Sequence, residues 1–313
     1  MNDQTGKSPL PGSLRERLRQ GRFVMTAELV PPLSCDAREL LHKAAALKGV
    51  ADAVNVTDGA GARAHMSALA GASLLFRAGI EPILQMTCRD KNRLALQSEM
   101  MGAAALGVRN LLLLSGDDPK SGDQPETKSV FDVDSRTLID TARQLRDDGT
   151  LPTGRKVAGK AEFFIGAADM PIDPPEGWQP NALAAKINAG AQFAQTQFCM
   201  NASIVRRYVA ALEKAGITKK LALLIGVNPL RSAKSARWMK HHLYGTIIAD
   251  TYIARLEQAA DPAREGLRIC VELIEELATI RGVAGVHIMA PGNDAAIPEA
   301  IKAARPRIQR AAV

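Results

Sequence analysis

The chain has 313 residues, of which 46% are hydrophobic and 23% charged, a composition that is typical of globular proteins and excludes a disordered chain. Its formal net charge is +7, yet the basic residues are scattered among acidic ones, and aromatic residues make up only 4%. This argues against a surface that stacks nucleic-acid bases and fits a soluble enzyme that handles polyanionic ligands.

The sequence has no feature that directs it to a membrane or out of the cell. No stretch approaches the ~18 consecutive apolar residues of a membrane span, and the first residues lack the apolar core of a signal peptide. Cys35, Cys88, Cys199 and Cys270 show no CxxC spacing and are expected to be free thiols in a reducing compartment. We therefore expect a cytoplasmic protein.

Apolar runs of strand length alternate with helical segments along the chain. A polar tail over residues 1–12 precedes a short helix, Leu14–Gln20, which Ser13 can cap and Gly21 can end. Strands are expected at Phe23–Leu29, Ala53–Thr57, Pro82–Thr87, Asn110–Leu114, Glu162–Gly166, Phe193–Phe198, Leu221–Ile225 and Gly285–Met289. Helices are expected at Asp36–Leu47, Met66–Ala78, Arg93–Leu106, Ser135–Asp147, Ala182–Ala189, Ala202–Ala215, Ser232–Lys240, Thr246–Gln258 and Ala263–Ile280, with a closing helix to Ala304.

This alternation predicts an α/β protein with parallel strands. Eight strands in a chain of this length indicate a (β/α)8 TIM barrel. A doubly wound sheet would need a glycine-rich GxGxxG after its first strand, and none is present. We expect a single barrel domain at residues 22–305, preceded by a tail and short helix at residues 1–21 and followed by a basic tail at residues 306–313.

The run Leu111–Pro119 is the most informative stretch of the chain. Its leucines read as a buried strand that ends at Ser115 and Gly116, and two carboxylates, Asp117 and Asp118, follow at once. Enzymes with α/β folds place catalytic groups at such strand tips. Taken alone, the segment is better explained as a turn that uses Gly-Asp-Asp-Pro for its backbone angles. An active site is favoured because polar residues recur at the other strand ends.

Among those residues, three carry a chemical hypothesis. Glu28 stands between apolar neighbours where ionisation is costly, which suits a general acid; alternatively, it pairs with an arginine inside the barrel. Asp117 can stabilise a cationic intermediate if backbone N–H groups hold it as a carboxylate. Gln197 is an amide that needs partners, either in a ligand or in the fold. The other polar residues near strand ends and helix starts are Asn55, Thr57, Asp58, Arg63, Gln85, Thr87, Arg89, Ser115, Lys186, Asn228, Arg231 and His287.

The histidines do not indicate a metal site. Val286 and Ile288 place His287 within a strand, where a structural role is favoured, and His241 and His242 look like surface residues at a helix end. No group of residues has the spacing of metal ligands, so metal chemistry is disfavoured.

Several stretches, in the right order from about residue 22 to residue 300, match one family. They are Thr26-Ala-Glu-Leu-Val-Pro-Pro, Val54-Asn-Val-Thr-Asp, Gln85-Met-Thr-Cys-Arg-Asp-Lys-Asn-Arg-Leu-Ala-Leu-Gln-Ser, Leu114-Ser-Gly-Asp, Ser129-Val-Phe-Asp-Val-Asp-Ser, Ala189-Gly-Ala with Gln195-Thr-Gln, and Gly285-Val-His-Ile-Met-Ala. On these stretches the chain resembles the methylenetetrahydrofolate reductases, in particular their short bacterial and acetogen-type catalytic subunits.

The resemblance implies a (β/α)8 flavoprotein of one-carbon metabolism and methionine biosynthesis. Such an enzyme reduces 5,10-methylenetetrahydrofolate to 5-methyltetrahydrofolate, and hydride passes from NAD(P)H to flavin and then to the folate. The resemblance makes Glu28 the general acid that helps open the five-membered ring, places Asp117 by the flavin and the pterin, and makes Gln197 a folate ligand. FAD, with FMN as the fallback, would be held by Thr57, Asp58, Ala60, Gln85, Ser115, Gly116, Asp117, Phe131, Asp132, Asp169 and Lys186.

Three stretches depart from well-studied members of that family. Gln85-Met-Thr-Cys stands where those enzymes have His-Leu-Thr-Cys, and Leu114-Ser-Gly-Asp stands where they have Leu-Arg-Gly-Asp, so an arginine near the flavin is lost. The stretch Asn228–Trp238 lacks the aromatic residue that stacks on NADH in those enzymes.

Two other functions compete with the reductase. One is a pterin-dependent methyltransferase or synthase on the same barrel, which needs no flavin. The other is a non-catalytic subunit of a one-carbon complex, which the presence of both Glu28 and Asp117 disfavours. No ribose-reading motif distinguishes NADH from NADPH, and the sequence leaves open a homo-oligomer or a partner subunit that donates electrons.

Overall fold

The computed structural model describes residues 12–311, and the tail expected at residues 1–12 lies outside this range except for Gly12. The strands are β1 (Val24–Leu29), β2 (Ala53–Val56), β3 (Pro82–Thr87), β4 (Asn110–Leu114), β5 (Phe164–Asp169), β6 (Phe193–Met200), β7 (Ala222–Val227), β8 (Ile247–Ile248) and β9 (Val283–Ile288). The α-helices are α1 (Leu14–Arg19), α2 (Ala37–Ala45), α3 (Ala68–Arg77), α4 (Arg93–Ala105), α5 (Ser135–Asp147), α6 (Asn181–Ala189), α7 (Ala202–Lys214), α8 (Ala233–His242), α9 (Asp250–Gln258), α10 (Pro262–Ala278) and α11 (Ala296–Ala311). Two short 3-10 helices, η1 (Ala60–Ala62) and η2 (Pro119–Ser121), follow β2 and β4.

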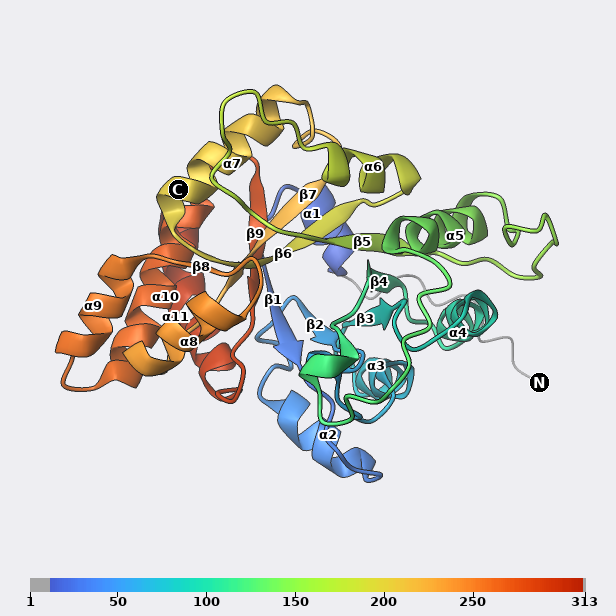
Figure 1. Ribbon diagram of the computed structural model, residues 1–313, viewed down its shortest axis with the longest axis horizontal. Helices are drawn as coiled ribbons and strands as arrows, with labels where there is room; N and C mark the ends of the chain where they lie inside the picture. The colour runs from blue at the N-terminus through green and yellow to red at the C-terminus, as the bar shows by residue number, and fades with distance from the viewer. Residues whose placement is uncertain (1–11, 312–313) are drawn as a thin grey trace.

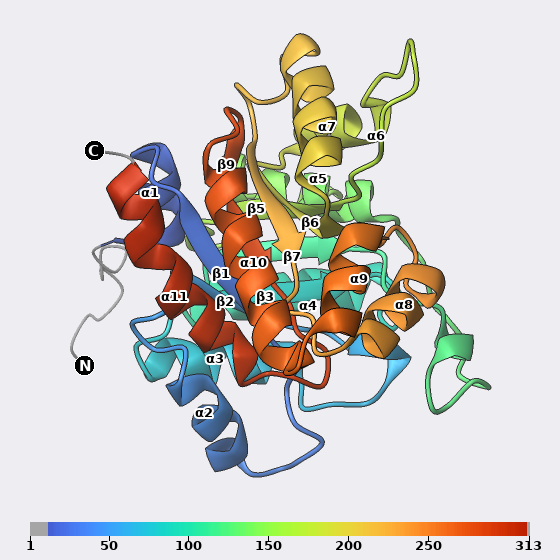
Figure 2. The same cartoon turned by 90° about the vertical axis from the view of Figure 1, so that its left-hand side faces the viewer.

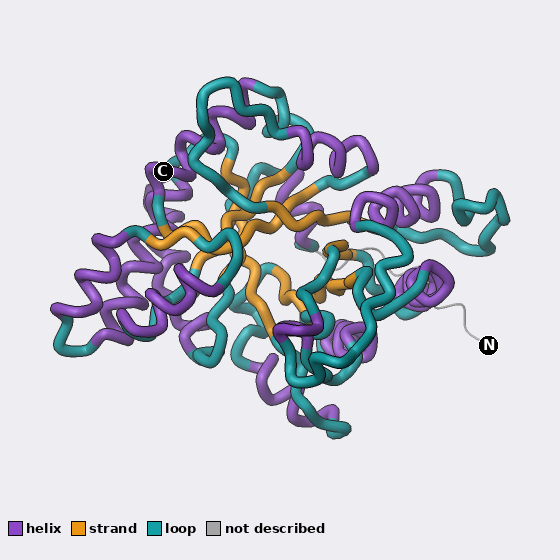
Figure 3. Tube along the Cα trace, in the orientation of Figure 1, coloured by secondary structure: helices purple, strands orange, loops and turns teal. Residues whose placement is uncertain are grey.

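Strands β1 to β7 and β9 form a closed barrel. Neighbours run in the order β5-β4-β3-β2-β1-β9-β7-β6, and β5 also pairs with β6, which closes the ring. Every one of these pairings is parallel. The strands gather in the centre of the molecule with helices around them (Figure 1, and by secondary structure in Figure 3). The expected (β/α)8 barrel is confirmed.

The helix expected over Thr246–Gln258 is wrong at its start. Ile247–Ile248 form the short strand β8, which extends the sheet beside the end of β6, and α9 begins only at Asp250. Two consecutive β-branched residues favour extended backbone, and Ile248 is buried in the core. A strand of this length has no periodicity of its own, so the sequence pattern merged it with the helix that follows.

Residues along each strand alternate between the surrounding helices and the barrel interior. On β1, Met25, Ala27 and Leu29 belong to the main core between strands and helices, whereas Val24 belongs to a second apolar cluster. Because this cluster takes one residue from each of β1 to β7, it fills the interior of the barrel. Its buried members are Leu14, Val24, Ala53, Ile83, Leu112, Phe164, Phe193 and Leu224. Thr26 and Glu28 share the inward face of Val24, nearer the carboxyl end of the strand.

Helix α1 corresponds to the predicted short helix, and it covers the amino-terminal end of the barrel. Leu14 is fully buried in the interior cluster, and its backbone N–H donates to Glu81 Oε1 at 3.0 Å. Arg17 of α1 and Arg305 of α11 both pair with the buried Asp52, each at 3.1 Å. Figure 2 shows α1 beside the end of α11. This end of the barrel is filled by packing and ion pairs, which leaves the carboxyl ends of the strands for chemistry.

The last helix is longer than expected. It continues to Ala311, beyond the predicted end at Ala304 and into the segment expected as a C-terminal tail. Of the helices in residues 12–311, none is long and apolar enough to cross a membrane.

Candidate active site

Glu28 lies near the carboxyl end of β1, on the inward face of the barrel. It is opposite Asn55 of β2 in the parallel register, and its side chain is 20% exposed. Its Oε2 lies 3.9 Å from Nε2 of His287 on β9. The alternative expectation of an arginine partner is therefore wrong, because an imidazole occupies that place. A carboxyl group that is largely shielded but still open at the strand ends can give a proton to a ligand there.

A chain of buried polar side chains continues inward from His287. Nδ1 of His287 is 3.0 Å from Oγ1 of Thr26, and Gln195 Nε2 donates to the same oxygen at 3.0 Å. Gln195 and Asn55 form a reciprocal amide pair, with Asn55 Nδ2 donating at 2.6 Å and Gln195 Nε2 donating at 3.0 Å. All four side chains are buried. Each of these four side chains therefore has at least one hydrogen-bond partner, as burial requires.

Thr26 and Gln195 are functional candidates that the sequence reading missed. Each lies two positions before a predicted residue, Glu28 or Gln197, so the alternation of a strand puts it on the same face one layer deeper. That period-two relation was the available signal.

Asp117 joins the loop after β4 to the loop after β2. Its Oδ2 accepts the backbone N–H of Gly61 at 2.9 Å. The buried Arg89, after β3, donates from Nη1 to the carbonyl oxygens of Gly59 at 3.2 Å and of Asp117 at 3.4 Å, and it pairs with Asp90 at 2.6 Å. Three consecutive strand ends are thus tied into one surface. The carboxylate expected at the tip of β4 is placed there.

Gly116 can adopt its backbone conformation, and can lie close to the end of β3, only because it lacks a side chain. Its φ is +98°, a region that L side chains rarely adopt, and a Cβ at this position would lie 3.0 Å from the Cβ atoms of Thr87 and Arg89. The turn after β4, which also carries the exposed Ser115, can therefore lie flat against the end of β3.

The end of β2 carries an unpaired hydroxyl group. Oγ1 of Thr57 is buried and has no hydrogen-bond partner among the described residues. An unsatisfied buried hydroxyl costs on the order of 1–3 kcal/mol, so such a group usually has a role. Nearby in sequence, Asp58 Oδ2 accepts from the N–H and hydroxyl of Thr87 at 2.9 and 3.2 Å and pairs with Lys91 at 3.1 Å. Asp58 is therefore engaged in holding its loop to β3.

Phe131 and Asp132 lie in the segment that leads to α5. Phe131 has a φ of +39°, is 46% exposed, and its N–H donates to the carbonyl of Cys88 at 3.2 Å. The Arg93 guanidinium binds both carboxylate oxygens of Asp132, at 2.7 and 2.9 Å, and these hydrogen bonds lower the pKa of Asp132 to about 2. Asp132 thus anchors this loop to the start of α4.

Asp169, expected in a loop, is the last residue of β5. Burial raises the pKa of Asp169, while the Tyr208 hydroxyl, which donates to Oδ2 at 2.6 Å, opposes that shift. Lys186 Nζ donates to the carbonyl of Ala168 at 2.6 Å, and its charge also favours the Asp169 carboxylate. Tyr208 is a further residue that the sequence reading missed, since it projects from α7 and not from a strand end.

Gln197 lies where the pairing of β6 with β7 changes register. Its Oε1 accepts the backbone N–H of Phe198 at 2.9 Å, and its Nε2 donates to the carbonyl of Tyr244 at 3.3 Å. The second contact brings the loop between α8 and β8 to the end of β6. Both polar atoms of the amide thus have partners within the fold, which is the alternative that we expected for this residue besides a ligand.

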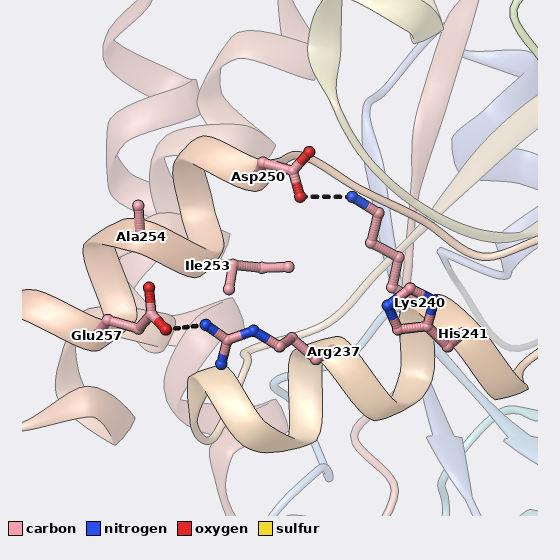
Figure 4. Close-up of a pocket in the computed structure, with 7 residues that line it drawn as sticks. All are labelled: Arg237, Lys240, His241, Asp250, Ile253, Ala254 and Glu257. Carbon is pink, nitrogen blue, oxygen red and sulfur yellow. Dashed lines mark hydrogen bonds and ion pairs between the residues drawn. The ribbon is translucent and has the colours of Figure 1, made fainter.

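A cavity of about 310 Å³ lies between the outer helices α8 and α9 (Figure 4). Its charged groups are paired: Lys240 Nζ lies 2.5 Å from Asp250, and Arg237 pairs with Glu257. None of the predicted site residues lines it. The carboxyl ends of β1 to β6, which carry those residues, are therefore the candidate active site.

Comparison with known proteins decides the family. A model of the family described as methylenetetrahydrofolate reductase matches residues 13–305. The chain belongs to this family. A probable methylenetetrahydrofolate reductase (NADPH) of Caenorhabditis elegans is 25% identical over 240 residues, which are 74% of this chain and 33% of that protein. A 5,10-methylenetetrahydrofolate reductase of Pectobacterium carotovorum subsp. carotovorum is 25% identical over 223 residues, 69% of this chain and 67% of that one.

The methylenetetrahydrofolate reductase 1 of Schizosaccharomyces pombe is 24% identical over 225 residues, 66% of this chain and 33% of that protein. The match therefore spans about a third of the nematode and yeast relatives and two thirds of the bacterial one. Among solved structures, an uncharacterised protein from Clostridium thermocellum that binds two copies of 5-methyl-5,6,7,8-tetrahydrofolic acid has the same fold. Its TM-score is 0.64 at 13% identity, over 95% of this chain and 99% of that one.

Proposed function

We propose that this member of the methylenetetrahydrofolate reductase family reduces 5,10-methylenetetrahydrofolate to 5-methyltetrahydrofolate, with a bound flavin and with NAD(P)H as the electron donor. The observation that carries the proposal is the position of Glu28, a shielded but reachable carboxyl group at the open end of the barrel in a chain of this family. The protein would act on folate in one-carbon metabolism and methionine biosynthesis. The name of its nematode relative specifies NADPH, and the donor of this protein would be NADH or NADPH.

Glu28 would serve as the general acid. It would give its proton to N10 of the folate as the bond between N10 and the methylene carbon breaks, and the electron pair of that bond would stay on N10. The lone pair of N5 would then form a cationic iminium with the methylene carbon. General acid catalysis of this kind contributes about 10²–10⁴-fold to a rate.

Asp117 would stabilise the cation that ring opening produces. Its Oδ2 already accepts the Gly61 N–H, which fixes the carboxylate at the tip of β4. A fixed negative charge beside a developing positive charge needs no reorganisation during the reaction. Gln197 would bind the folate, exchanging one of its two structural hydrogen bonds for a ligand contact.

The ends of β2, β3 and β4 fit a flavin on two observations: the buried Thr57 hydroxyl lacks a partner, and Gly116 leaves its backbone open to close approach. We propose FAD, with FMN as the fallback, bound by Thr57, Ala60, Gln85, Ser115, Gly116, Asp117 and Phe131. Asp58, Asp132, Asp169 and Lys186 have partners within the chain, so we assign them to holding the surrounding loops. When bound, the flavin would accept hydride from NAD(P)H and supply it to the methylene carbon.

An absorbance spectrum of freshly purified protein, followed by anaerobic titration with NADH, NADPH and 5-methyltetrahydrofolate, tests the proposal. We expect flavin bands that are bleached by a nicotinamide nucleotide or by 5-methyltetrahydrofolate and restored by methylenetetrahydrofolate. Protein that stays free of flavin after incubation with FAD and FMN, yet still converts folate, would show that the flavin assignment is wrong. Flavin-loaded protein that no folate can reoxidise would show that the substrate assignment is wrong.

A further inference from the structure

His287 connects Glu28 to the buried polar chain of Thr26, Gln195 and Asn55. One ring nitrogen, Nε2, faces the Glu28 carboxyl group at 3.9 Å, and the other, Nδ1, lies 3.0 Å from the Thr26 hydroxyl. His287 is 3% exposed, so water cannot easily replace either partner. The two nitrogens of a neutral imidazole have opposite roles, and the partner of one therefore decides what the other presents.

The buried chain favours one tautomer of His287. The reciprocal bonds between Gln195 and Asn55 leave the second N–H of Gln195 to donate to Thr26 Oγ1. The Thr26 hydroxyl has one hydrogen to donate, and two acceptors lie within its reach. The nearer one is Nδ1 of His287 at 3.0 Å, and the other is the carbonyl of Val286 at 3.3 Å. When Thr26 donates its hydroxyl hydrogen to Nδ1, that nitrogen is the acceptor, so the imidazole hydrogen is on Nε2, which faces Glu28.

We propose that His287 is a positioning residue for the Glu28 acid, held by Thr26 in the tautomer that presents an N–H group to the carboxylate. The inference rests on the proposed function, because it assigns a role in the ring-opening step. At 3.9 Å, Nε2 of His287 and Oε2 of Glu28 are too far apart for a hydrogen bond. Catalytic hydrogen bonds often tighten only when substrate is bound, so a rotation of the Glu28 side chain toward His287 in the complex is part of the proposal.

The role of His287 is confined to one proton-transfer step. As Glu28 loses its proton to N10 of the folate, its carboxyl group becomes a carboxylate, and His287 Nε2–H donates a hydrogen bond to the oxygen that forms. No proton leaves His287, and no electron is transferred between the two residues. A hydrogen bond to a charged acceptor is stronger than one to a neutral acceptor, so this contact favours the state after proton transfer.

A spectroscopic test reads the tautomer without any ligand. Protein labelled with ¹⁵N-histidine gives separate NMR signals for protonated and unprotonated ring nitrogens, and a His287→Gln variant assigns the pair that belongs to His287. We expect the proton on Nε2 in the native protein and in Thr26→Ser, which keeps the hydroxyl. Thr26→Val should shift or broaden both His287 signals. Thr141→Val is the matched control, since the buried Thr141 hydroxyl donates to the carbonyl of Thr137 within α5.

A kinetic test then separates positioning from folding. In Thr26→Val and His287→Leu, we expect the folate half-reaction to slow by up to about 100-fold, the effect of a misplaced catalytic group, while flavin reduction by NAD(P)H stays within about twofold. Because both variants remove the Nε2–H donor beside the proposed acid, the pH profile of the folate half-reaction should differ from that of the native protein. Thr26→Ser should restore the rate and the pH profile.

Three results would overturn the proposal. They are a native His287 with its proton on Nδ1, a His287 spectrum that Thr26→Val leaves unchanged, and an equal loss in both half-reactions together with an unshifted pH profile. Failure of the proposed function is distinguishable, because it would abolish folate conversion in the native protein and leave the tautomer measurement intact.

Discussion

The side chain of Asp117 accepts a hydrogen bond from the backbone N–H of Gly61 at 2.9 Å, and this contact fastens the loop after β4 to the loop after β2. Arg89, between them after β3, donates to carbonyl groups of both loops. Residues that would contact flavin and residues that would contact folate therefore belong to one tied surface. Asp117 has a structural and a chemical role on that surface, and the two can be separated by substitution.

Asp117→Asn keeps a side-chain oxygen that can accept the Gly61 N–H but removes the negative charge. We expect the thermal midpoint to stay within about 2 °C of the native protein. The rate of flavin reduction should change, and the folate half-reaction should slow by about 10²-fold, because a fixed charge at the reacting centre is lost. Stopped-flow measurement of the two half-reactions checks this.

Asp118→Asn is the control for that experiment. Asp118 is adjacent, and its side chain accepts the backbone N–H of Lys120 at the start of η2, which an asparagine can also do. Asp118→Asn should leave the rates of both half-reactions within about twofold of the native rates, a change that is small beside the effect of a preorganised charge. Equal rates in the two variants would remove Asp117 from the chemistry.

Thr57→Val replaces the buried, unpaired hydroxyl by a methyl group of nearly the same size. In the flavin-free protein this should leave the free energy of unfolding unchanged or raise it by up to about 1 kcal/mol, because a buried hydroxyl without a partner is a cost. Flavin affinity should fall by about tenfold, the equivalent of one hydrogen bond of roughly 1.4 kcal/mol. Fluorescence titration with FAD measures it.

For the hydroxyl, Thr141→Val is again the matched control. The Thr141 hydroxyl donates to the carbonyl of Thr137 at 2.9 Å within α5, so its loss should not change flavin affinity. A native dissociation constant in Thr57→Val would mean that this hydroxyl does not face the cofactor.

The barrel was predictable because its strands are apolar runs bounded by glycine and polar residues. Asn110–Leu114 is bounded by Gly107 and Gly116, and both glycines have positive φ, so the residues that mark the strand ends are also those that the turns require. The pairing of Ile247–Ile248 with β6 could not be read from the sequence. It depends on a long-range contact made by two residues, which carry no period.

The candidate site was predictable at the strand tips and not one layer below them. Glu28 and Asp117 follow directly from strand ends, but the amide pair of Asn55 and Gln195 spans 140 positions in the chain. Tyr208 reaches Asp169 from a helix on another part of the barrel. Such partners are set by the three-dimensional arrangement of the barrel, whereas propensity and spacing describe only local structure.

Tyr208→Phe should destabilise the protein in a way that depends on pH. The hydroxyl donates to Asp169, whose pKa burial raises, and losing this bond would raise that pKa further. An acid with a raised pKa in the folded state holds its proton longer than the unfolded chain does, so stability falls as pH rises through that folded pKa. We expect a loss of about 1–3 kcal/mol at pH 7 and a smaller loss near pH 4.

Denaturant unfolding at the two pH values measures the effect of Tyr208→Phe. Tyr252→Phe is its control, since Tyr252 lies on the outer helix α9 and is only partly buried. A loss that is the same at pH 4 and pH 7 would mean that the hydroxyl stabilises packing without acting on the Asp169 carboxyl group.

Glu28→Gln removes the proton that the proposed reaction uses and keeps the size and hydrogen-bonding ability of the side chain. Flavin reduction by NAD(P)H should survive nearly intact, because that half-reaction opens no ring. Reduction of methylenetetrahydrofolate should fall by about 10²–10⁴-fold, the usual contribution of general acid catalysis. A glutamate with a purely structural role predicts a different pattern, in which both half-reactions weaken together and stability is lost.

The contact with His287 sharpens the reading of Glu28→Gln. The oxygen of a glutamine amide can still accept a hydrogen bond from Nε2–H of His287, so the buried chain beneath it should keep its arrangement. The thermal midpoint should therefore change by less than about 2 °C. A selective loss of the folate half-reaction in a protein of native stability then isolates the proton itself. If the folate half-reaction of Glu28→Gln stays within about threefold of the native rate, far less than an acid contributes, another residue donates the proton.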